Sequence, residues 1–393
     1  MEANVLVCPA CGRENRVEDG ACVCGYDEAL EQEVVKYAPQ NALTATLSIV
    51  PGDAGPRFEA KTGTPWTLDV DDVKAFITQI ERKFKLKRKN HSFITENQLP
   101  FSTATLLKKY NKGLIEFPGL VESFMDNLKN QATLNKTRPA GGSVIFIHYH
   151  KDNEEESLGR IFVIMVDNSN VFNFDEGLVP RKLPSIDIDA IRQAALVDMT
   201  LFDASYPHKD GEPYVQFITG KSSSNFFKIA LGCTEELDNN KSIESVRSAL
   251  IDFTKHLDLP TSVRVRLLES FSKLMAEKSK STTNKTITLK ELEHAVDKIL
   301  PEDSKGRGNF EQFALLGEYK INEFFEPSRV SSGHFEKVQL KDTENDYSCN
   351  ISVGIISDDI NSDSKIIYDK QEERLIIRLS EADKVKMNGV FGS

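Results

Sequence analysis

The chain lacks long hydrophobic runs. Among its 393 residues, the longest fully apolar stretch is 161–166, far short of the roughly 20 residues that a membrane-spanning helix needs. The N-terminus has neither a basic region nor a long apolar stretch, so we do not expect a signal peptide. We therefore expect a cytoplasmic protein that does not span a membrane.

Cysteine is also scarce. Six cysteines in a chain of this length do not make a disulfide scaffold, and four of the six lie within the first 24 residues. Cys233 and Cys349 are isolated in the sequence, and we interpret both as ordinary buried or half-buried thiols. This usage fits a reducing cytoplasm.

An excess of positive charge is missing as well. The chain has 60 acidic and 49 basic side chains, which give a formal net charge of −11. As a whole it repels nucleic acids and anionic membranes, so any contact with DNA has to come from a local basic patch.

Hydrophobic residues make up 39% of the chain, enough to bury a core. The length suggests two or three domains.

The sequence does contain a pair of cysteine motifs near its start, Cys8-Pro-Ala-Cys11-Gly and Cys22-Val-Cys24-Gly. Each glycine allows the backbone to curl so that amide groups face the sulfurs. Four thiolates on two facing turns give the tetrahedral coordination that suits zinc. Cys8, Cys11, Cys22 and Cys24 therefore predict a structural Zn²⁺ ribbon over residues 1–27, with two disulfides or four free thiols as the alternative. In so small a module, the metal supplies most of the folding free energy.

Hydrophobic periodicity predicts an α+β fold for the rest of the chain. Strands are expected at 42–50, 143–150, 160–167, 171–175, 183–188 and 213–219, and near the C-terminus at 336–341, 348–356, 364–368 and 373–379. The strands 143–150 and 160–167 are expected to form a hairpin. Helices are expected from a cap at Asp69 or Asp71 to about Lys85, and at 102–114, 118–132, 242–257, 261–278, 288–299 and 308–316. The Gly/Pro-rich stretch 51–65 is expected to be a loop.

These elements predict four parts of the chain. The zinc ribbon, 1–27, is followed by an α+β body, 33–235, with a mainly antiparallel sheet and helices. A helical middle segment, 241–320, and a small β-rich C-terminal part, 321–393, complete the chain.

The densest run of cations in the chain is 82–89. Its six basic residues are the predicted DNA contacts: Arg82, Lys83, Lys85, Lys87, Arg88 and Lys89. Such a run releases counterions from phosphates and gives affinity without sequence preference. The alternative is a solvated helix end whose cations complement the helix dipole. A second cluster at Lys108, Lys109 and Lys112 could extend the surface.

Other polar groups favour structural roles. His148 and His150 are two apart on an expected strand, so both face one way, and we interpret them as core or edge histidines rather than as half of a metal site. Asp187, Asp189 and Asp198 flank strands, which is typical of caps and turns rather than of nuclease carboxylates. Lys221 to Ser224 lacks the spacing of a phosphate loop, and a helix cap on Ser223 or Ser224 explains it better.

Several segments resemble, in the same order, those of NdpA/YejK-type bacterial nucleoid-associated proteins. They are Gly141–Tyr149, Ile186-Asp187-Ile188, Val197-Asp198-Met199-Thr200, Tyr214–Gly220, Asn225-Phe226-Phe227, Leu231-Gly232-Cys233, Phe310–Phe313 and a terminal hairpin at Ile366–Leu379. The resemblance covers roughly residues 33–385, and the zinc ribbon is an addition to the family pattern. It implies association with the nucleoid and DNA binding with little sequence preference, and it implies no catalytic residues.

The sequence thus favours a non-enzymatic nucleoid-associated DNA-binding protein of the cytoplasm. The alternative is a partner-docking or regulatory subunit of a DNA-maintenance or phage-defence assembly, with the zinc ribbon as the docking piece. A metal-dependent nuclease is a third and weaker hypothesis. The sequence does not determine the oligomeric state.

Overall fold

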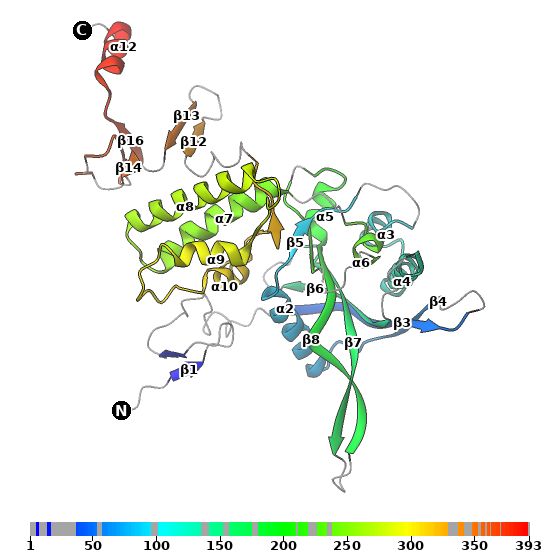
Figure 1. Ribbon diagram of the computed structural model, residues 1–393. Helices are drawn as coiled ribbons and strands as arrows, with labels where there is room; N and C mark the ends of the chain where they lie inside the picture. Colours follow the sequence, from blue (N-terminus) through cyan, green and yellow to red (C-terminus); the bar gives the residue numbers. More distant parts are fainter. Residues whose placement is uncertain are drawn as a thin grey trace. The chain divides into compact units, whose positions relative to one another are not determined.

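The computed structural model describes residues 5–7, 14–16, 37–52, 57–95, 101–134, 141–151, 157–174, 180–209, 211–218, 226–233, 238–328, 337–341, 348–352, 355–357, 360–361, 363–369 and 371–391. The chain divides into two compact units (Figure 1). The first unit combines Met1–Val246 with Glu311–Phe325, and the second combines Arg247–Phe310 with Glu326–Ser393. We assigned 311–320 to the helical segment and 321–325 to the C-terminal part, whereas the structure groups both with the first unit.

The first unit is built on a seven-stranded antiparallel sheet with the strand order β4-β3-β6-β7-β8-β9-β5. The strands are β3 (Tyr37–Val50), β4 (Arg57–Pro65), β5 (Asn90–Ser92), β6 (Gly142–Lys151), β7 (Arg160–Phe174), β8 (Pro180–Asp198) and β9 (Val215–Ile218). The predicted hairpin is confirmed, since β6 and β7 pair from Ser143↔Val166 to Tyr149↔Arg160.

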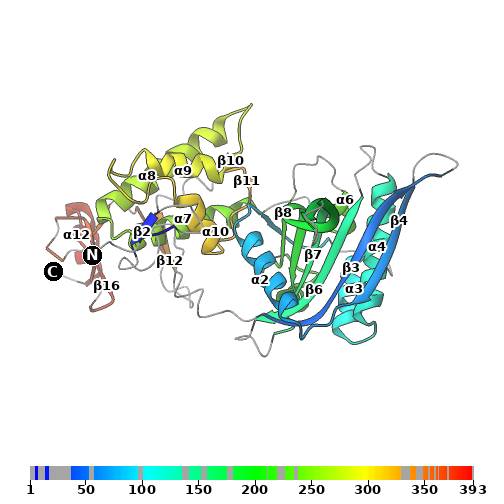
Figure 2. The same ribbon diagram turned by 90° about the horizontal axis from the view of Figure 1, so that it is seen from below.

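Helices cover both faces of this sheet (Figure 2). One face packs against α2 (Asp71–Lys85), and the other against α3 (Thr103–Asn111), α4 (Phe117–Leu134), α5 (Met199–Ser205) and α6 (Phe226–Ala230). Successive side chains of a strand point to opposite faces. Accordingly Ile145 and Ile147 of β6 pack on the α2 side, whereas Val144 and Phe146 pack on the side of α3 and α4. Both faces are apolar because both are buried.

Two expectations for the early part of this unit were wrong. Residues 57–65 form the edge strand β4 rather than a loop. Phe58 and Ala60 pack into the core. Position 63 requires glycine, because a Cβ there would lie 2.6 Å from the Thr44 carbonyl oxygen, next to a bulge in β3. Helix α2 is capped by neither aspartate: its N-cap is Val70, which makes no side-chain cap hydrogen bond.

The second unit is helical and then β-rich. Its helices are the later part of α7 (Asn239–His256), α8 (Thr261–Lys280) and α9 (Leu289–Asp297), and α10 (Phe310–Leu316) begins at its boundary. Small pieces of sheet follow at β12 (Lys337–Lys341), β13 (Ser348–Ser352), β14 (Ile356–Ser357), β15 (Ile366–Asp369) and β16 (Arg374–Ile377). The terminal hairpin is confirmed by the pairing of β15 with β16. A last helix, α12 (Glu381–Phe391), was not predicted.

None of the described helices is long and apolar enough to cross a membrane.

Candidate nucleic-acid interface

The basic run 82–89 lies at the C-terminal end of α2. This helix buries Ile77, Ile80 and Phe84 on one stripe, and Arg82, Lys83 and Lys85 occupy its last turn. Cations near a helix C-terminus complement its dipole, so part of the run has a purely structural reason to be there. Lys87, Arg88 and Lys89 follow the C-cap residue Leu86. Within the run Lys87 is exposed, whereas Arg82, Lys83, Lys85 and Arg88 are half-buried.

Lys89 does not belong to the predicted surface. Its side chain is 5% exposed, and its Nζ atom donates hydrogen bonds to the Phe84 and Lys85 carbonyl oxygens, each at 2.9 Å. These are carbonyls that the end of a helix leaves without an intrahelical partner. Burial lowers the pKa of Lys89 to about 8, opposed by the carboxylates of Glu318 and Glu81. Lys89 therefore closes the end of α2, and a phosphate cannot reach it.

Two acidic residues from the late part of the unit engage this run. Arg88 makes a bidentate contact with Glu311: its Nη2 donates to Oε2 at 2.7 Å, and its Nε donates to Oε1. Lys85 lies 3.9 Å from Glu318. Fork-like arginine–carboxylate pairs are stronger than ordinary hydrogen bonds, so Arg88 is held firmly. A phosphate has to compete with Glu311 for this guanidinium.

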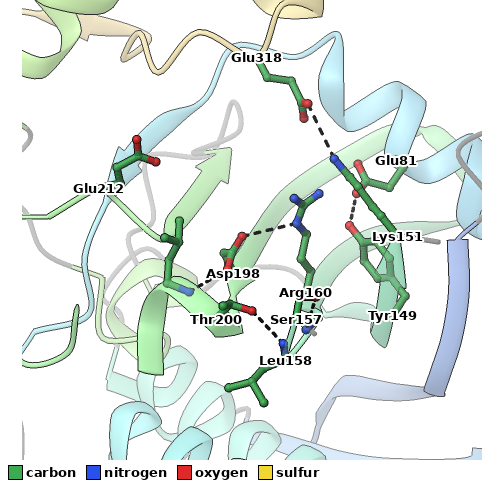
Figure 3. A network of polar contacts seen from close by, with 12 residues as sticks. Glu81, Tyr149, Lys151, Ser157, Leu158, Arg160, Asp198, Thr200, Glu212 and Glu318 are labelled. Atoms are coloured by element: carbon green, nitrogen blue, oxygen red, sulfur yellow. Dashed lines mark hydrogen bonds and ion pairs between the residues drawn. The ribbon is translucent and has the colours of Figure 1, made fainter. Parts of the chain in front are cut away.

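Glu318 forms ion pairs with two lysines, and the pair with Lys151 is drawn in Figure 3. It adopts a left-handed backbone conformation with φ of +53°, at the end of α10, and lies 3.9 Å from both Lys85 and Lys151. Burial opposes ionisation of Glu318, but the cations of Lys85, Lys151 and Arg160 outweigh it and hold the pKa of this carboxyl below its usual range. Glu318 is therefore charged at neutral pH and neutralises the cations around it.

A cavity of about 400 Å³ opens beside this network, lined by Arg160, Asp198, Glu212, Glu318 and Lys320 among others. Its charged groups are already paired. Arg160 lies 3.6 Å from Asp198, and Lys320 contacts Glu212. The opposite charges in this cavity leave little net attraction for an anion.

Asp198 has a structural role that the sequence suggested. It is the N-cap of α5, and its Oδ1 accepts a hydrogen bond from the Leu201 amide at 2.9 Å. Nearby, the Leu158 amide donates to the Thr200 hydroxyl at 2.8 Å. Asp187 and Asp189 lie in β8, but their side chains are outside the described residues. Among the described residues, no three His, Cys, Asp or Glu side chains gather in a way that could hold a metal ion.

His148 and Tyr149 of β6 have structural roles. The His148 ring bridges the Tyr110 hydroxyl at Nδ1 (2.7 Å) and the Leu158 carbonyl at Nε2 (3.0 Å), so both of its nitrogens have partners. On the other face, the buried Tyr149 hydroxyl donates to Glu81, and burial raises the pKa of Tyr149 well above its usual value. His148 is thus held in place on the α3 side, which agrees with its interpretation as a core or edge histidine.

The second lysine cluster cannot extend the run 82–89. Lys108 and Lys109 lie on α3 and Lys112 follows at its C-cap, on the face of the sheet opposite α2. Lys108 also stacks over the Tyr206 ring at 4.6 Å from its centroid. The layers of the fold therefore separate two clusters that are close together in the sequence.

The predicted zinc ligands Cys8, Cys11, Cys22 and Cys24 are outside the described residues, as is Lys221 to Ser224. What is described near the cysteines is a short antiparallel pair, β1 (Val5–Val7) and β2 (Glu14–Arg16). Cys8 and Cys11 fall between these two strands in the sequence. Zinc binding stays a prediction.

Comparison with known proteins identifies the class. The model of the family described as nucleoid-associated protein YejK matches residues 58–382, which is most of the chain. The chain belongs to this family, and the resemblance noted in the sequence is confirmed. The N-terminal cysteine motifs lie outside the matched residues.

Individual relatives are distant bacterial proteins. A nucleoid-associated protein of Shewanella denitrificans is 21% identical over 269 residues, which cover 68% of this chain and 71% of that protein. Nucleoid-associated proteins of Pseudomonas entomophila and Pseudomonas aeruginosa are 22% and 20% identical over 208 residues. The match spans 59% of the length of each Pseudomonas protein.

Proposed function

We propose that this chain is a non-enzymatic DNA-binding protein of the bacterial nucleoid that contacts duplex phosphates with little sequence preference. Family membership supports the association with the nucleoid. The proposed DNA-contact site is supported by one observation: the chain's densest run of cations lies at the end of α2. Lys87 is exposed there, and Arg82 and Lys83 lie in the last turn of the helix. We call Arg82, Lys83 and Lys87 the α2 basic surface.

Non-specific binding follows from the chemistry of this surface. Lysine and arginine side chains at a helix end can neutralise phosphates, and phosphate contacts carry no direct sequence information. An acidic chain with net charge −11 is repelled by DNA at long range. Its affinity therefore depends on a few local contacts, and it falls steeply with salt.

The test is a triple variant, Arg82→Gln, Lys83→Gln and Lys87→Gln. With three phosphate contacts removed, the slope of log K against log salt should become shallower by about 2.7, at roughly 0.9 for each contact. Binding should weaken to a similar degree for DNA of every sequence. Fluorescence anisotropy over a salt series measures both effects, and far-UV circular dichroism checks that α2 is intact.

A matched control removes the same number of charges from the opposite face: Lys108→Gln, Lys109→Gln and Lys112→Gln. Its salt slope should equal that of the wild type. If both triple variants lost the same DNA affinity and the same salt slope, binding would depend on the overall charge of the protein rather than on the α2 basic surface. A wild type that does not bind DNA at low salt would favour the alternative function, a partner-docking or regulatory subunit that uses the zinc ribbon.

Zinc is the second part of the proposal. We expect one Zn²⁺ per chain on Cys8, Cys11, Cys22 and Cys24, because two closely spaced pairs supply four thiolates. The double variant Cys8→Ser, Cys11→Ser should lose that equivalent in elemental analysis and should keep the thermal unfolding transition of the sheet. A full equivalent of zinc in the variant would exclude this ligand set.

A further inference from the structure

A cavity of about 380 Å³ opens between the start of α3, the later part of α4 and α6. Figure 1 shows these three helices next to one another. Part of the lining is apolar and buried, since Ile94, Ala104 and Ala230 are each at most 5% exposed. A concave, mostly apolar lining is typical of a binding site. The α2 basic surface does not contribute to this cavity, because α2 packs on the opposite face of the sheet.

Two large apolar side chains that line this cavity are exposed to solvent. Phe101, which precedes α3, is 69% exposed, and Ile229 of α6 is 50% exposed. Single exposed apolar residues are common on protein surfaces, but two that line the same apolar cavity form a continuous apolar surface. Such a surface marks a place where another molecule binds.

The cavity is also uncharged. None of the described residues that line it is charged, although charged residues make up 28% of the chain. Helix α4 shows the same separation, because its Asp126 and Lys129 pair with each other at 2.6 Å and do not line the cavity. A nucleic-acid backbone needs cations to neutralise its phosphates. The cavity therefore matches a neutral partner rather than a nucleic acid.

Helix α4 presents amide side chains to this cavity instead of charges. Asn127, Asn130 and Gln131 are three and four residues apart, so they share one face of the helix. Asn127 donates a hydrogen bond to the Phe101 carbonyl oxygen at 2.9 Å. In the described part of the chain, the side-chain amides of Asn130 and Gln131 have no hydrogen-bond partner. An amide group has both donors and an acceptor, which are the groups that pair with the backbone of another peptide.

We infer that this cavity, which we call the α4 groove, is a docking site for an uncharged peptide segment of a protein partner, with apolar side chains. Phe101 and Ile229 contact the apolar side chains of that segment, and Asn130 and Gln131 pair with its backbone amide groups. Because the groove and α2 lie on opposite faces of the sheet, a docked peptide does not compete with DNA for the α2 basic surface.

A random-peptide library displayed on phage is the probe. It is selected on the wild-type protein and counter-selected on the double variant Phe101→Asp, Ile229→Asp. The enriched peptides should be rich in apolar residues and poor in charged ones. A synthetic copy of the most enriched peptide should bind the double variant about tenfold more weakly than the wild type, because a few central apolar contacts supply most of the affinity of an interface. Fluorescence anisotropy measures both affinities.

The matched control is the double variant Ile49→Asp, Leu114→Asp. Ile49 and Leu114 are 49% and 69% exposed, as Ile229 and Phe101 nearly are, but they do not line the groove. The control should bind the peptide as the wild type does, and far-UV circular dichroism should be unchanged in both double variants. Failure to enrich any peptide, a charged consensus, or an equal loss of affinity in both double variants would overturn the inference.

Two further measurements exclude other occupants of the groove. A single-stranded DNA oligonucleotide should not displace the peptide, and the double variant Phe101→Asp, Ile229→Asp should sediment as the wild type does. Displacement by the oligonucleotide would assign the groove to nucleic acid, and a change in sedimentation would assign it to a second copy of the chain. Either result would overturn the inference.

Discussion

The two faces of the central sheet are built from the same strands, yet they bury different chemistry. The side covered by α3, α4, α5 and α6 is a large apolar core. The side covered by α2 has a smaller apolar core, and at the end of that helix charged groups gather: Lys85, Arg88 and Lys89 with Glu81, Glu311 and Glu318. In the function proposed above, the α3 side contributes to stability alone, whereas the α2 side contributes to stability through its apolar core and to DNA binding through the charged end of α2.

The largest expected effect comes from the apolar face. Phe124 is buried in α4 and contacts the Phe146 ring edge-on, with centroids 5.8 Å apart. Phe124→Ala should lower the free energy of unfolding by about 3–5 kcal/mol, through lost burial and the cavity left behind. Urea denaturation measures this loss. DNA affinity of the folded protein should not change.

The counterpart on the other face is Phe84→Ala. Phe84 packs edge-on against Phe162 at 4.7 Å, and Lys89 lies over its ring. This variant should lose a similar amount of stability, and it should also weaken DNA binding because the end of α2 carries the basic surface. If Phe124→Ala weakens DNA binding as much as Phe84→Ala does, the division of roles between the faces is wrong.

A smaller effect concerns pH. His91 in β5 is buried, and burial together with the cations of Lys89 and Lys320 lowers its pKa to about 3. The folded pKa is below the unfolded value of 6.5, so between pH 3 and 6.5 the unfolded chain binds more protons. The contribution of neutral His91 to stability is therefore fully present above pH 6.5, and it decreases as the pH falls from 6.5 to 3.

His91→Gln should remove this dependence. Between pH 7 and pH 5, the free energy of unfolding of the wild type should fall by about 2 kcal/mol more than that of the variant. The figure follows from a slope of roughly 1.4 kcal/mol for each pH unit below 6.5. Urea denaturation at the two pH values gives the comparison. An identical loss in both proteins would assign the acid sensitivity to other groups.

The smallest expected effect concerns the charged groups at the end of α2. Glu318→Gln should free Lys85 and Lys151 from their acidic partner. The salt slope of DNA binding should become steeper, by about 0.9 for each cation that then reaches a phosphate. Glu59→Gln is the matched control, because it also removes one negative charge from the first unit, and Glu59 pairs with Arg57 on the edge strand β4. A slope unchanged by Glu318→Gln would mean that DNA does not approach this end of α2.

Local patterns predicted much of the sheet and most helices. The apolar runs around Ile145 and Ile164 are typical of strands buried on both faces, and the spacing of Ile77, Ile80 and Phe84 is typical of a helix with one buried stripe. Strand β4 was missed because its flanking glycines and prolines resemble a loop. An edge strand tolerates them, since only one of its sides pairs.

The candidate site was harder to predict because its partners are distant in sequence. Arg88 and Glu311 are separated by 223 residues, and no periodicity links them. Lys89 looked like the other cations of its run, and only the packing around the end of α2 shows that it is buried. The opposite placement of Lys108 likewise depends on sheet topology rather than on spacing.

The first unit is discontinuous along the chain, and this has a consequence for its synthesis. Residues 247–310 are made before Glu311–Phe325, the last piece of that unit. At about 5–20 residues per second, the delay is several seconds. During it, a nascent chain has the basic run but neither Glu311, Glu318 nor Asn322, whose side chain accepts a hydrogen bond from the His91 amide. Arg88 and Lys85 are therefore made several seconds before their acidic partners, Glu311 and Glu318.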